Sequence, residues 1–382
     1  MTTTLRDLRA VYVVGIGFHR YQFASETPYV DLGLTAVRAA LADAGVAWPA
    51  VDSAYFAKAL LPMAPGRAML RHLGATGLPI VHVENASASG SAAFRHACME
   101  VAAGLAEISL VIGVDKPMPV GRAESLARIG ALADDAIAPF THFALLADAY
   151  AHRTGARFED IALVAVKNHR NGAGNPFAQH QKPRTLDEIL GGKKIAGAFT
   201  SLQCTPVGEG AAAVIVASEE GLRRQGLGLD RAVRVVSSAG RSQRVYDDAT
   251  RYDAMLTEET AAIALREAQV ASAELDVVEL HDAFTVEEVE YVEAMGLCPD
   301  GQAVPRLKDG EFDIGGRCAV SPSGGLISMG HPIGPTGVGQ IGEVTRQLRG
   351  EAGARQQPNA RIGLAHMVGV GAVCYVHVLQ RP

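Results

Sequence analysis

Short runs of apolar residues alternate with longer alanine-rich stretches along this chain, a pattern typical of an α/β fold with buried strands. The pattern predicts helices at residues 29–44, 87–103 and 257–271, and strands at residues 11–17, 80–84, 108–114, 210–218, 232–238, 277–280, 361–367 and 372–379. The elements follow a similar order in the two halves of the chain. This similarity suggests an internal duplication.

The rhythm changes between residues 115 and 202, which hold five prolines and the loop-like stretch "KNHRNGAGNPFAQHQKPRT" at 167–185. We interpret 115–202 as a mixed insertion lying over the sheet. The expected organisation is therefore an N-terminal half at 1–225 that contains this insertion, followed by a C-terminal half at 226–382.

Composition narrows the classes of protein. With 382 residues, of which 48% are hydrophobic, the chain can bury a large core, and a net charge of −6 provides no broad basic field for nucleic acid. Its five cysteines lie far apart without a CxxC pair, which favours reduced thiols. No stretch approaches eighteen uninterrupted apolar residues, and no signal-like segment occurs. We expect a cytoplasmic protein without a membrane span or a structural metal site.

Serines gather where the apolar run ending at Val83 turns into a helix, in "VENASASGSAAFRHA" (83–97). Ser87, Ser89 and Ser91 are good N-cap residues. A nucleophile at such a corner would instead lie at the positive end of the helix dipole. Both interpretations remain open from these residues alone.

Two histidines lie in stretches that favour chemistry. In "SPSGGLISMGHPIGPTGVGQIGEV" (321–344), His331 stands between a glycine and a proline just before a helical run, as a base or as a polar loop residue. In "ELHDAFTVEEVEYVEAMGLC" (279–298), His281 and Asp282 follow a strand, so that His281 could hold a water and Asp282 could cap the next helix. The pattern predicts that Glu287, Glu288 and Glu290 form the solvated face of that helix.

The stretches "NASASG", "HDAF", "GGLISMGHPIGPTGVGQ" and "MVGVG" (367–371) occur in the order and approximate spacing of the four active-site loops of the thiolase superfamily. Essentially the whole chain resembles the sterol-carrier-protein-x or lipid-transfer-protein branch. The resemblance implies a duplicated five-layer αβαβα fold with an inserted loop domain, a homodimeric core and acyl-CoA substrates. It also implies coenzyme A as substrate or product, with no tightly bound cofactor.

The resemblance also assigns roles to residues. Ser87 falls on the family's nucleophilic cysteine, His331 on the histidine that activates it, and His281 on the residue that holds a water in the first oxyanion hole. The Ser87 N–H and the glycine loop ending at Gly371 fall on the second hole. Met367 and Ala283 stand where other members have cysteines.

Coenzyme A contacts are less defined. We assign them to Gly324 and Gly325 in the glycine-rich stretch and to Lys167 and Arg170, although a solvated loop charge is the simpler interpretation of each cation. The same holds for other basic residues of the insertion, namely Lys182, Arg184, Lys193 and Lys194.

Serine at position 87 leaves three functional hypotheses. The first is a thiolase-type acyl-CoA C-acyltransferase that condenses or cleaves 3-oxoacyl-CoA, with Ser87 a natural or engineered replacement of cysteine. The second is a cysteine-independent retro-aldolase acting on a β-hydroxyacyl-CoA, and the third is a non-catalytic acyl-CoA-binding scaffold. By analogy with the branch, we also expect a small partner chain with a zinc ribbon and an OB-like domain.

Overall fold

The computed structural model describes residues 3–117, 139–246, 251–369 and 373–381. Its main sheet runs in the order β3-β2-β4-β7-β1-β8-β12-β11-β9-β10. The first half contributes β1 (Val11–Gln22), β2 (Ser53–Ala57), β3 (Ile80–Val83), β4 (Ile108–Asp115) and β7 (Glu209–Ser218). The second contributes β8 (Val233–Ser242), β9 (Val277–Glu279), β10 (Ala319–Val320), β11 (Ile362–Gly369) and β12 (Val373–Gln380).

The two halves of this sheet repeat one topology. Counted along the chain, each half orders its strands first, fifth, fourth, second, third, starting from β1 in one half and β8 in the other. β1 and β8 meet through a short antiparallel ladder that pairs Val11 with Val235 and Val13 with Val233. The repeat supports the predicted duplication. Its boundary at residue 225, between α9 (Glu219–Arg224) and β8, remains a proposal.

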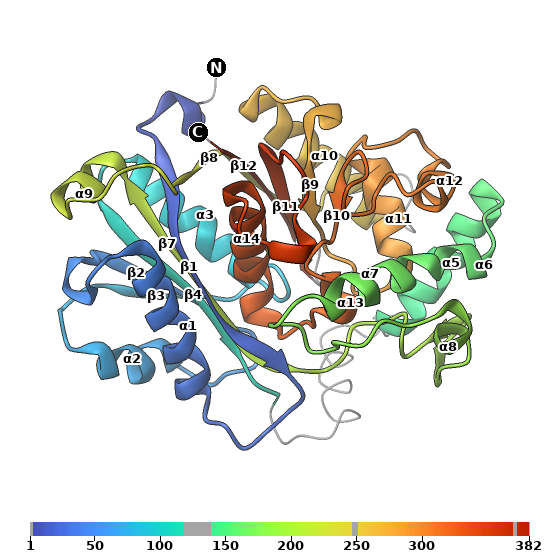
Figure 1. Ribbon diagram of the computed structural model, residues 1–382, viewed down its shortest axis with the longest axis horizontal. Helices are drawn as coiled ribbons and strands as arrows, with labels where there is room; N and C mark the ends of the chain where they lie inside the picture. The colour runs from blue at the N-terminus through green and yellow to red at the C-terminus, as the bar shows by residue number, and fades with distance from the viewer. Residues whose placement is uncertain (1–2, 118–138, 247–250, 370–372, 382) are drawn as a thin grey trace.

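Helices α3 (Ser89–Ala102) and α14 (Ile333–Arg349) lie between the two halves of the sheet, as Figure 1 shows. Each contacts strands of both halves as well as the other helix. α1 (Tyr29–Ala44) covers the outer face of the first half, and α10 (Tyr252–Ala268) covers β8 and β12 of the second. Helix, sheet, helix pair, sheet and helix make the five layers, which confirms the predicted fold.

Three apolar clusters fill the spaces between these layers. One packs α1 against β1, β4 and β7, the second surrounds α3 and α14, and the third lies under α10, α11 and the inserted segment. Short α-helices outside the inserted segment include α2 (Pro65–Leu70), α11 (Thr285–Ala294), α12 (Ala303–Lys308) and α13 (Gly325–Ser328). No helix of the described part is long and apolar enough to cross a membrane.

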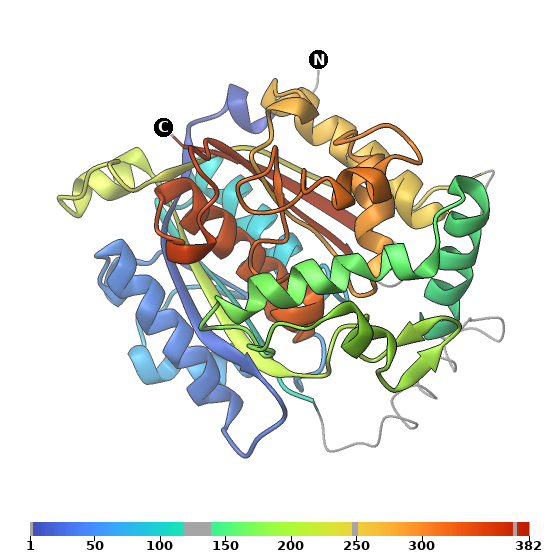
Figure 2. The same cartoon turned by 45° about the vertical axis from the view of Figure 1, so that its right-hand side comes forward.

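The inserted segment lies against α11 and α13 of the second half, where its green helices come forward in Figure 2. Its described elements are α5 (Pro139–Thr154), α6 (Phe158–Ile161), α7 (Leu163–Ala173), α8 (Leu186–Leu190), β5 (Lys194–Ala196) and β6 (Phe199–Thr200). The loop predicted from residue 167 is wrong as far as residue 173. The buried face of α7 carries polar side chains such as Asn168 and Asn171, whose hydrogen-bonding groups have partners inside the protein. The sequence therefore lacks the apolar periodicity from which a helix is predicted.

Candidate active site

The turn between β3 and α3 presents Ser87. Ala86 adopts a left-handed conformation with φ of 48°. The Ser89 hydroxyl fastens the turn, because it donates to the Ala86 carbonyl at 2.6 Å and accepts from the Asn85 N–H at 2.8 Å. Ser89 therefore stabilises the turn, and the buried Ser87 hydroxyl can bond a residue outside it.

That partner is His331. The Ser87 Oγ lies 3.0 Å from His331 Nε2, and His331 Nδ1 lies 2.8 Å from Thr336 Oγ1. The Thr336 hydroxyl donates its proton to the Pro332 carbonyl at 2.6 Å, so its oxygen is an acceptor for Nδ1–H. This assigns the proton of the neutral imidazole to Nδ1 and leaves Nε2 to accept from Ser87.

The surroundings keep His331 neutral. Burial, and then the neighbouring His281, lower the pKa of His331 well below its usual range. A neutral imidazole with a free Nε2 lone pair is a general base at neutral pH. Ser87, His331 and Thr336 thus form a relay in which the serine can give up its proton during attack.

Close packing of α3 against α14 brings Ser87 and His331 together. A Cβ on Gly90 would lie 2.8 Å from the Gly334 carbonyl oxygen, and one on Gly337 would lie 2.6 Å from the Ser91 nitrogen. Glycine is required at both contacts because any side chain would push the helices apart. The N-terminal ends of the two helices consequently meet at the dyad.

Asp115 at the end of β4 holds the start of α14. Its buried carboxylate accepts from the Gly334 N–H at 2.7 Å and the Ala59 N–H at 2.8 Å. Burial raises the pKa of Asp115 to about 6, although these N–H groups favour the charged form. A carboxylate at a helix N-terminus also matches the helix dipole, so Asp115 anchors the segment that carries His331.

His281 faces the same site from the loop between β9 and α11. Its ring lies edge-to-face with the His331 ring at a centroid distance of 5.5 Å. Nδ1 lies 2.8 Å from Glu287 Oε1, and this carboxylate also accepts from the Tyr291 hydroxyl at 3.1 Å and the Phe284 N–H at 2.9 Å. Within the described residues, the buried Nε2 of His281 has no hydrogen-bond partner.

The prediction of a solvated glutamate face on α11 is wrong. Glu287, Glu288 and Glu290 are each 1% exposed, because α11 is enclosed by α5, α7 and α10. Glu287 supports His281, and Glu288 forms an ion pair with Lys167 at 3.0 Å. Burial raises the pKa of Glu290 to about 7. A helix surrounded on all sides does not show the amphipathic pattern on which the prediction relied.

The assignment of Lys167 to coenzyme A is also wrong. Its Nζ is buried and donates to the Val320 carbonyl and to Asn168 Oδ1, both at 2.6 Å. Next to it, Asp282 accepts from Asn168 Nδ2 at 2.6 Å and from the Leu326 N–H at 2.7 Å. Asp282 therefore joins α7 to the start of α13 instead of capping α11.

Packing accounts for the two neighbouring glycines. A Cβ on Gly324 would lie 2.7 Å from Gly172 Cα, and one on Gly325 would lie 2.0 Å from an Asp282 oxygen. These contacts give no support to their assignment to coenzyme A. Arg170 stays exposed and bonds Asp313 at 2.6 Å, so its phosphate contact remains a prediction.

Gly369, the last residue of β11, lies against the Ser87 turn. A Cβ on Gly369 would lie 2.5 Å from the Asn85 carbonyl oxygen. Gly371 lies outside the described residues. Met367 and Ala283 are both buried, and so are the thiols of all five cysteines.

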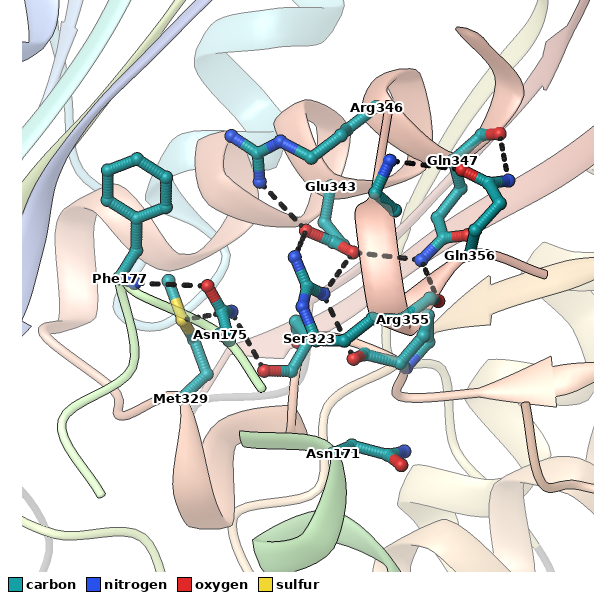
Figure 3. A network of polar contacts seen from close by, with 12 residues as sticks. Asn171, Asn175, Phe177, Ser323, Met329, Glu343, Arg346, Gln347, Arg355 and Gln356 are labelled. Atoms are coloured by element: carbon teal, nitrogen blue, oxygen red, sulfur yellow. Dashed lines mark hydrogen bonds and ion pairs between the residues drawn. The ribbon is translucent and has the colours of Figure 1, made fainter. Parts of the chain in front are cut away.

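A buried polar network supports the far side of α14 (Figure 3). Glu343 receives the guanidinium groups of Arg346 and Arg355, which outweigh the effect of burial and lower the pKa of Glu343. Ser323 donates from its N–H and hydroxyl to Glu279 at 2.8 and 2.7 Å. Burial, and then repulsion from Glu343, raise the pKa of Glu279 to about 8.

A cavity of about 20 Å³ separates this network from Thr336. Its polar lining comes from Tyr21, Glu279, Ser323, Thr336, Gln340 and Glu343. The volume suits about one water molecule. In the described part of the chain, no group of three or more His, Cys, Asp or Glu side chains could hold a metal ion.

Sequence reasoning missed Thr336, Asp115 and the supporting role of Glu287. Thr336 stands in the first turn after the His331–Pro332 corner, where a hydroxyl can face back toward the preceding residues. Glu287 is the third residue of α11 and bonds the N–H of Phe284, the usual place of a capping glutamate. Asp115 carries no local signal, because the N–H groups it binds come from distant segments.

Two family models match the chain. The model "Thiolase, N-terminal domain" matches residues 13–190, and the model "Thiolase C-terminal domain-like" matches residues 238–381. The chain is 35% identical to the benzoylsuccinyl-CoA thiolase subunit BbsB of Thauera aromatica, over 95% of both chains. It is 34% identical to human sterol carrier protein 2, covering 97% of this chain and 71% of that protein. It is 32% identical to the acetyl-CoA acetyltransferase of Methanothermobacter thermautotrophicus, over 98% and 100%.

Solved structures share the fold. The structure named "Ltp2-ChsH2(DUF35) aldolase" has a TM-score of 0.80 at 23% identity, covering 98% of both chains. Human mitochondrial 3-ketoacyl-CoA thiolase in complex with CoA has a TM-score of 0.76 at 17% identity, covering 100% of both chains. From the matched models, the relatives and the fold, this chain belongs to the thiolase family and is a thiolase-like enzyme of acyl-CoA acyl transfer.

Proposed function

We propose that the chain is a thiolase-type acyl-CoA C-acyltransferase in which Ser87 is the nucleophile and His331 its base. The relay from Ser87 through His331 to Thr336 carries this proposal. A serine hydroxyl is not ionised by its surroundings as a thiol is, so it requires a neutral base within hydrogen-bond reach. His331 meets that requirement at 3.0 Å.

The proposed acyl transfer begins on a 3-oxoacyl-CoA. Ser87 gives its proton to His331 Nε2 while Oγ attacks the 3-keto carbon. The bond between C2 and C3 then breaks, the departing acetyl-CoA enolate takes a proton from His331, and the acyl group stays on Ser87 as an ester. The thiol of coenzyme A then gives its proton to His331 as its sulfur bonds to the ester carbonyl carbon. The bond from that carbon to Ser87 Oγ breaks, Oγ takes the proton from His331, and a shortened acyl-CoA leaves. The reverse sequence is a Claisen condensation.

Charge stabilisation at the site supports this sequence of steps. Ser87 lies at the N-terminal end of α3, whose dipole favours a developing negative charge. Gly369 lies against the Ser87 turn, and His281 lies against His331. Of the two cations assigned to coenzyme A from the sequence, Arg170 is exposed, and we propose that it binds a coenzyme A phosphate.

The test is the intact mass of the protein after incubation with acetoacetyl-CoA, for this chain, Ser87→Cys and Ser87→Ala. We expect an acetyl adduct on the serine and cysteine forms and none on the alanine form. Peptide mapping should place the adduct on residue 87. If acetyl-CoA forms without any adduct, and forms equally fast with Ser87→Ala, then Ser87 is not the nucleophile.

Retro-aldol cleavage is the second candidate, favoured because Ser87, Ala283 and Met367 offer no thiol at the three positions where the resemblance expects one. Here His331 Nε2 takes the proton of a β-hydroxyl, the bond between C2 and C3 breaks, and an aldehyde or ketone leaves. The enolate thioester recovers the proton from His331. Aldehyde or ketone release from a β-hydroxyacyl-CoA, retained in Ser87→Ala and lost in His331→Ala, would identify this reaction.

The third hypothesis, a non-catalytic scaffold, makes a different prediction. A scaffold binds acyl-CoA but yields neither adduct nor product in both assays. A neutral base aligned on a buried hydroxyl would then have no use, which is why we place this hypothesis last.

We further propose a cytoplasmic homodimer that works with a small zinc-ribbon and OB-fold partner chain. Five buried cysteine thiols suit a reducing compartment. The relative from Thauera aromatica is described as a subunit, and the name of one structural neighbour joins Ltp2 to ChsH2. Light scattering on the purified chain should give the mass of a dimer, and full activity of that dimer alone would count against the partner.

A further inference from the structure

The ester that Ser87 would form differs chemically from the thioester of a cysteine. When a thiolate attacks an oxygen ester, the tetrahedral intermediate must expel either the thiolate, whose parent thiol has a pKa of about 8.5, or an alkoxide, a far stronger base. The better leaving group departs, so attack by coenzyme A mostly reverses. An intermediate formed by water carries no thiolate and goes forward once a base protonates the serine oxygen.

An acceptor for that water lies close to the dyad. His281 Nε2 is buried and has no hydrogen-bond partner among the described residues. Leaving such an atom unpaired costs about 1–3 kcal/mol, which a bound water removes. The 5.5 Å edge-to-face contact of the two histidine rings puts this nitrogen in the neighbourhood of His331 and Ser87.

Glu287 determines how His281 can hold the water. Its carboxylate accepts from Nδ1–H and is itself fixed by the Tyr291 hydroxyl and the Phe284 N–H. With the proton on Nδ1, Nε2 can only accept, so the water donates one hydrogen to it. The second hydrogen of the water is then free to be taken by His331.

We propose that water is an acyl acceptor of this enzyme, which therefore hydrolyses the bond between C2 and C3 of 3-oxoacyl-CoA to acetyl-CoA and a free carboxylic acid. This inference rests on the proposed Ser87 ester. The water gives a proton to His331 Nε2 as its oxygen bonds to the ester carbonyl carbon. The bond from that carbon to Ser87 Oγ breaks, Oγ takes the proton from His331, and the acid leaves. His281 and Glu287 act as positioning residues for the water.

The experiment follows benzoylacetyl-CoA and the full-length chain in ¹⁸O-labelled water without free coenzyme A. We expect benzoate carrying one ¹⁸O atom together with an equal amount of acetyl-CoA, and neither from Ser87→Ala. Glu287→Gln should slow benzoate release by about 10- to 100-fold and let the benzoyl adduct accumulate on Ser87. Glu290→Gln, on the same helix but without contact to His281, is the matched control and should release benzoate at the parent rate.

Three other results separate the possible failures. The first is a benzoyl adduct that forms as acetyl-CoA is released but leaves Ser87 only when coenzyme A is added. This result would overturn hydrolysis and keep the proposed acyl transfer. Equal benzoate release from the Glu287→Gln and Glu290→Gln variants would overturn the positioning of the water. Absence of both adduct and acetyl-CoA would overturn the Ser87 nucleophile and hydrolysis together. The parent chain alone distinguishes the first and third, so neither depends on a variant that fails to fold.

Discussion

At the scale of single residues, the site is organised by which groups keep their protons. Burial leaves His331 neutral, and Thr336 places the one proton of that ring on Nδ1. Glu279, behind the same threonine, is protonated because it is buried close to Glu343. Each of these protonation states has a consequence that can be measured without knowing the natural substrate.

Thr336→Val should weaken His331 as a base, because Nδ1–H loses its acceptor and a charged ring is less stabilised. The reporter is Ser87→Cys, whose new thiol would lie beside His331 and react with iodoacetamide as the thiolate. The same assay on the parent chain gives the background from its five natural cysteines. We expect alkylation at pH 7 to slow by about 10-fold in Ser87→Cys/Thr336→Val. Ser87→Cys/Thr336→Ser keeps the hydroxyl and should be alkylated as fast as Ser87→Cys. If Ser87→Cys/Thr336→Val is also alkylated as fast as Ser87→Cys, Thr336 does not support His331.

Glu279→Gln should stabilise the protein at pH 8 but not at pH 5. The folded pKa near 8 lies above the unfolded value of 4.5, so the folded state holds a proton that the unfolded state loses between these pH values. Stability of the parent therefore falls in this window by up to about 1.4 kcal/mol per pH unit. Urea unfolding at several pH values measures it, with Glu351→Gln as an exposed control. Parallel stability curves for parent and Glu279→Gln would contradict a protonated Glu279.

At the scale of elements, the crossing of α3 and α14 is what turns two distant motifs into one site. Small residues at the contact let the backbones approach, and the two N-terminal ends then carry Ser87 and His331 to hydrogen-bond distance. Because the two backbones are so close, a larger side chain at this contact should destabilise the protein, whereas one in an exposed loop should not.

Gly337→Ala should destabilise the protein by about 1–3 kcal/mol, since its methyl group would overlap the Ser91 backbone nitrogen. The gain in helix propensity, about 1 kcal/mol, offsets only part of this. Urea unfolding gives the stability, and alkylation of Ser87→Cys reports whether residue 87 has moved from His331. Gly228→Ala, where the nearest atom is 3.5 Å away, is the matched control. Unchanged stability in Gly337→Ala would mean that the helices can separate without cost.

At the scale of the whole molecule, a cluster of ion pairs joins the two halves opposite the described site elements. Asp43 of α1 contacts Arg231 before β8 and Arg349 at the end of α14, each at 2.8 Å. Arg349 is almost fully buried, with a side chain 2% exposed, so its charge depends on this partner. The cluster fixes the outer layer of one half to the central helices.

Asp43→Ala should therefore cost about 3 kcal/mol of stability, because it leaves the buried Arg349 charge without its closest carboxylate. Glu351→Gln, which touches the more exposed Arg231, should cost less than about 1 kcal/mol. Urea unfolding followed by circular dichroism compares the two. Equal, small losses would show that the cluster does not hold the halves together.

The apolar pattern by itself determined the α/β class, the limits of α1 and most strands within a few residues, because burial of a strand or helix face is written into local periodicity. The four motifs likewise identified the family and the positions of Ser87, His281 and His331. The strands β2 and β10 were not predicted, since β2 (Ser-Ala-Tyr-Phe-Ala) has no β-branched residue and β10 has only two residues.

Only the tertiary structure decided which polar residues serve the site. Glu287 and Lys167 look like solvated charges in sequence, and both become buried because segments far away in the chain enclose them. Lys167 also takes its partners Glu288 and Val320 from such segments, whereas Glu287 bonds residues close to it in sequence. The proton on Nδ1 of His331 follows from a hydroxyl turned toward Pro332, which composition does not encode. Sequence sets which groups are present, whereas packing sets their desolvation and their hydrogen bonds, and these two effects determine charge and reactivity.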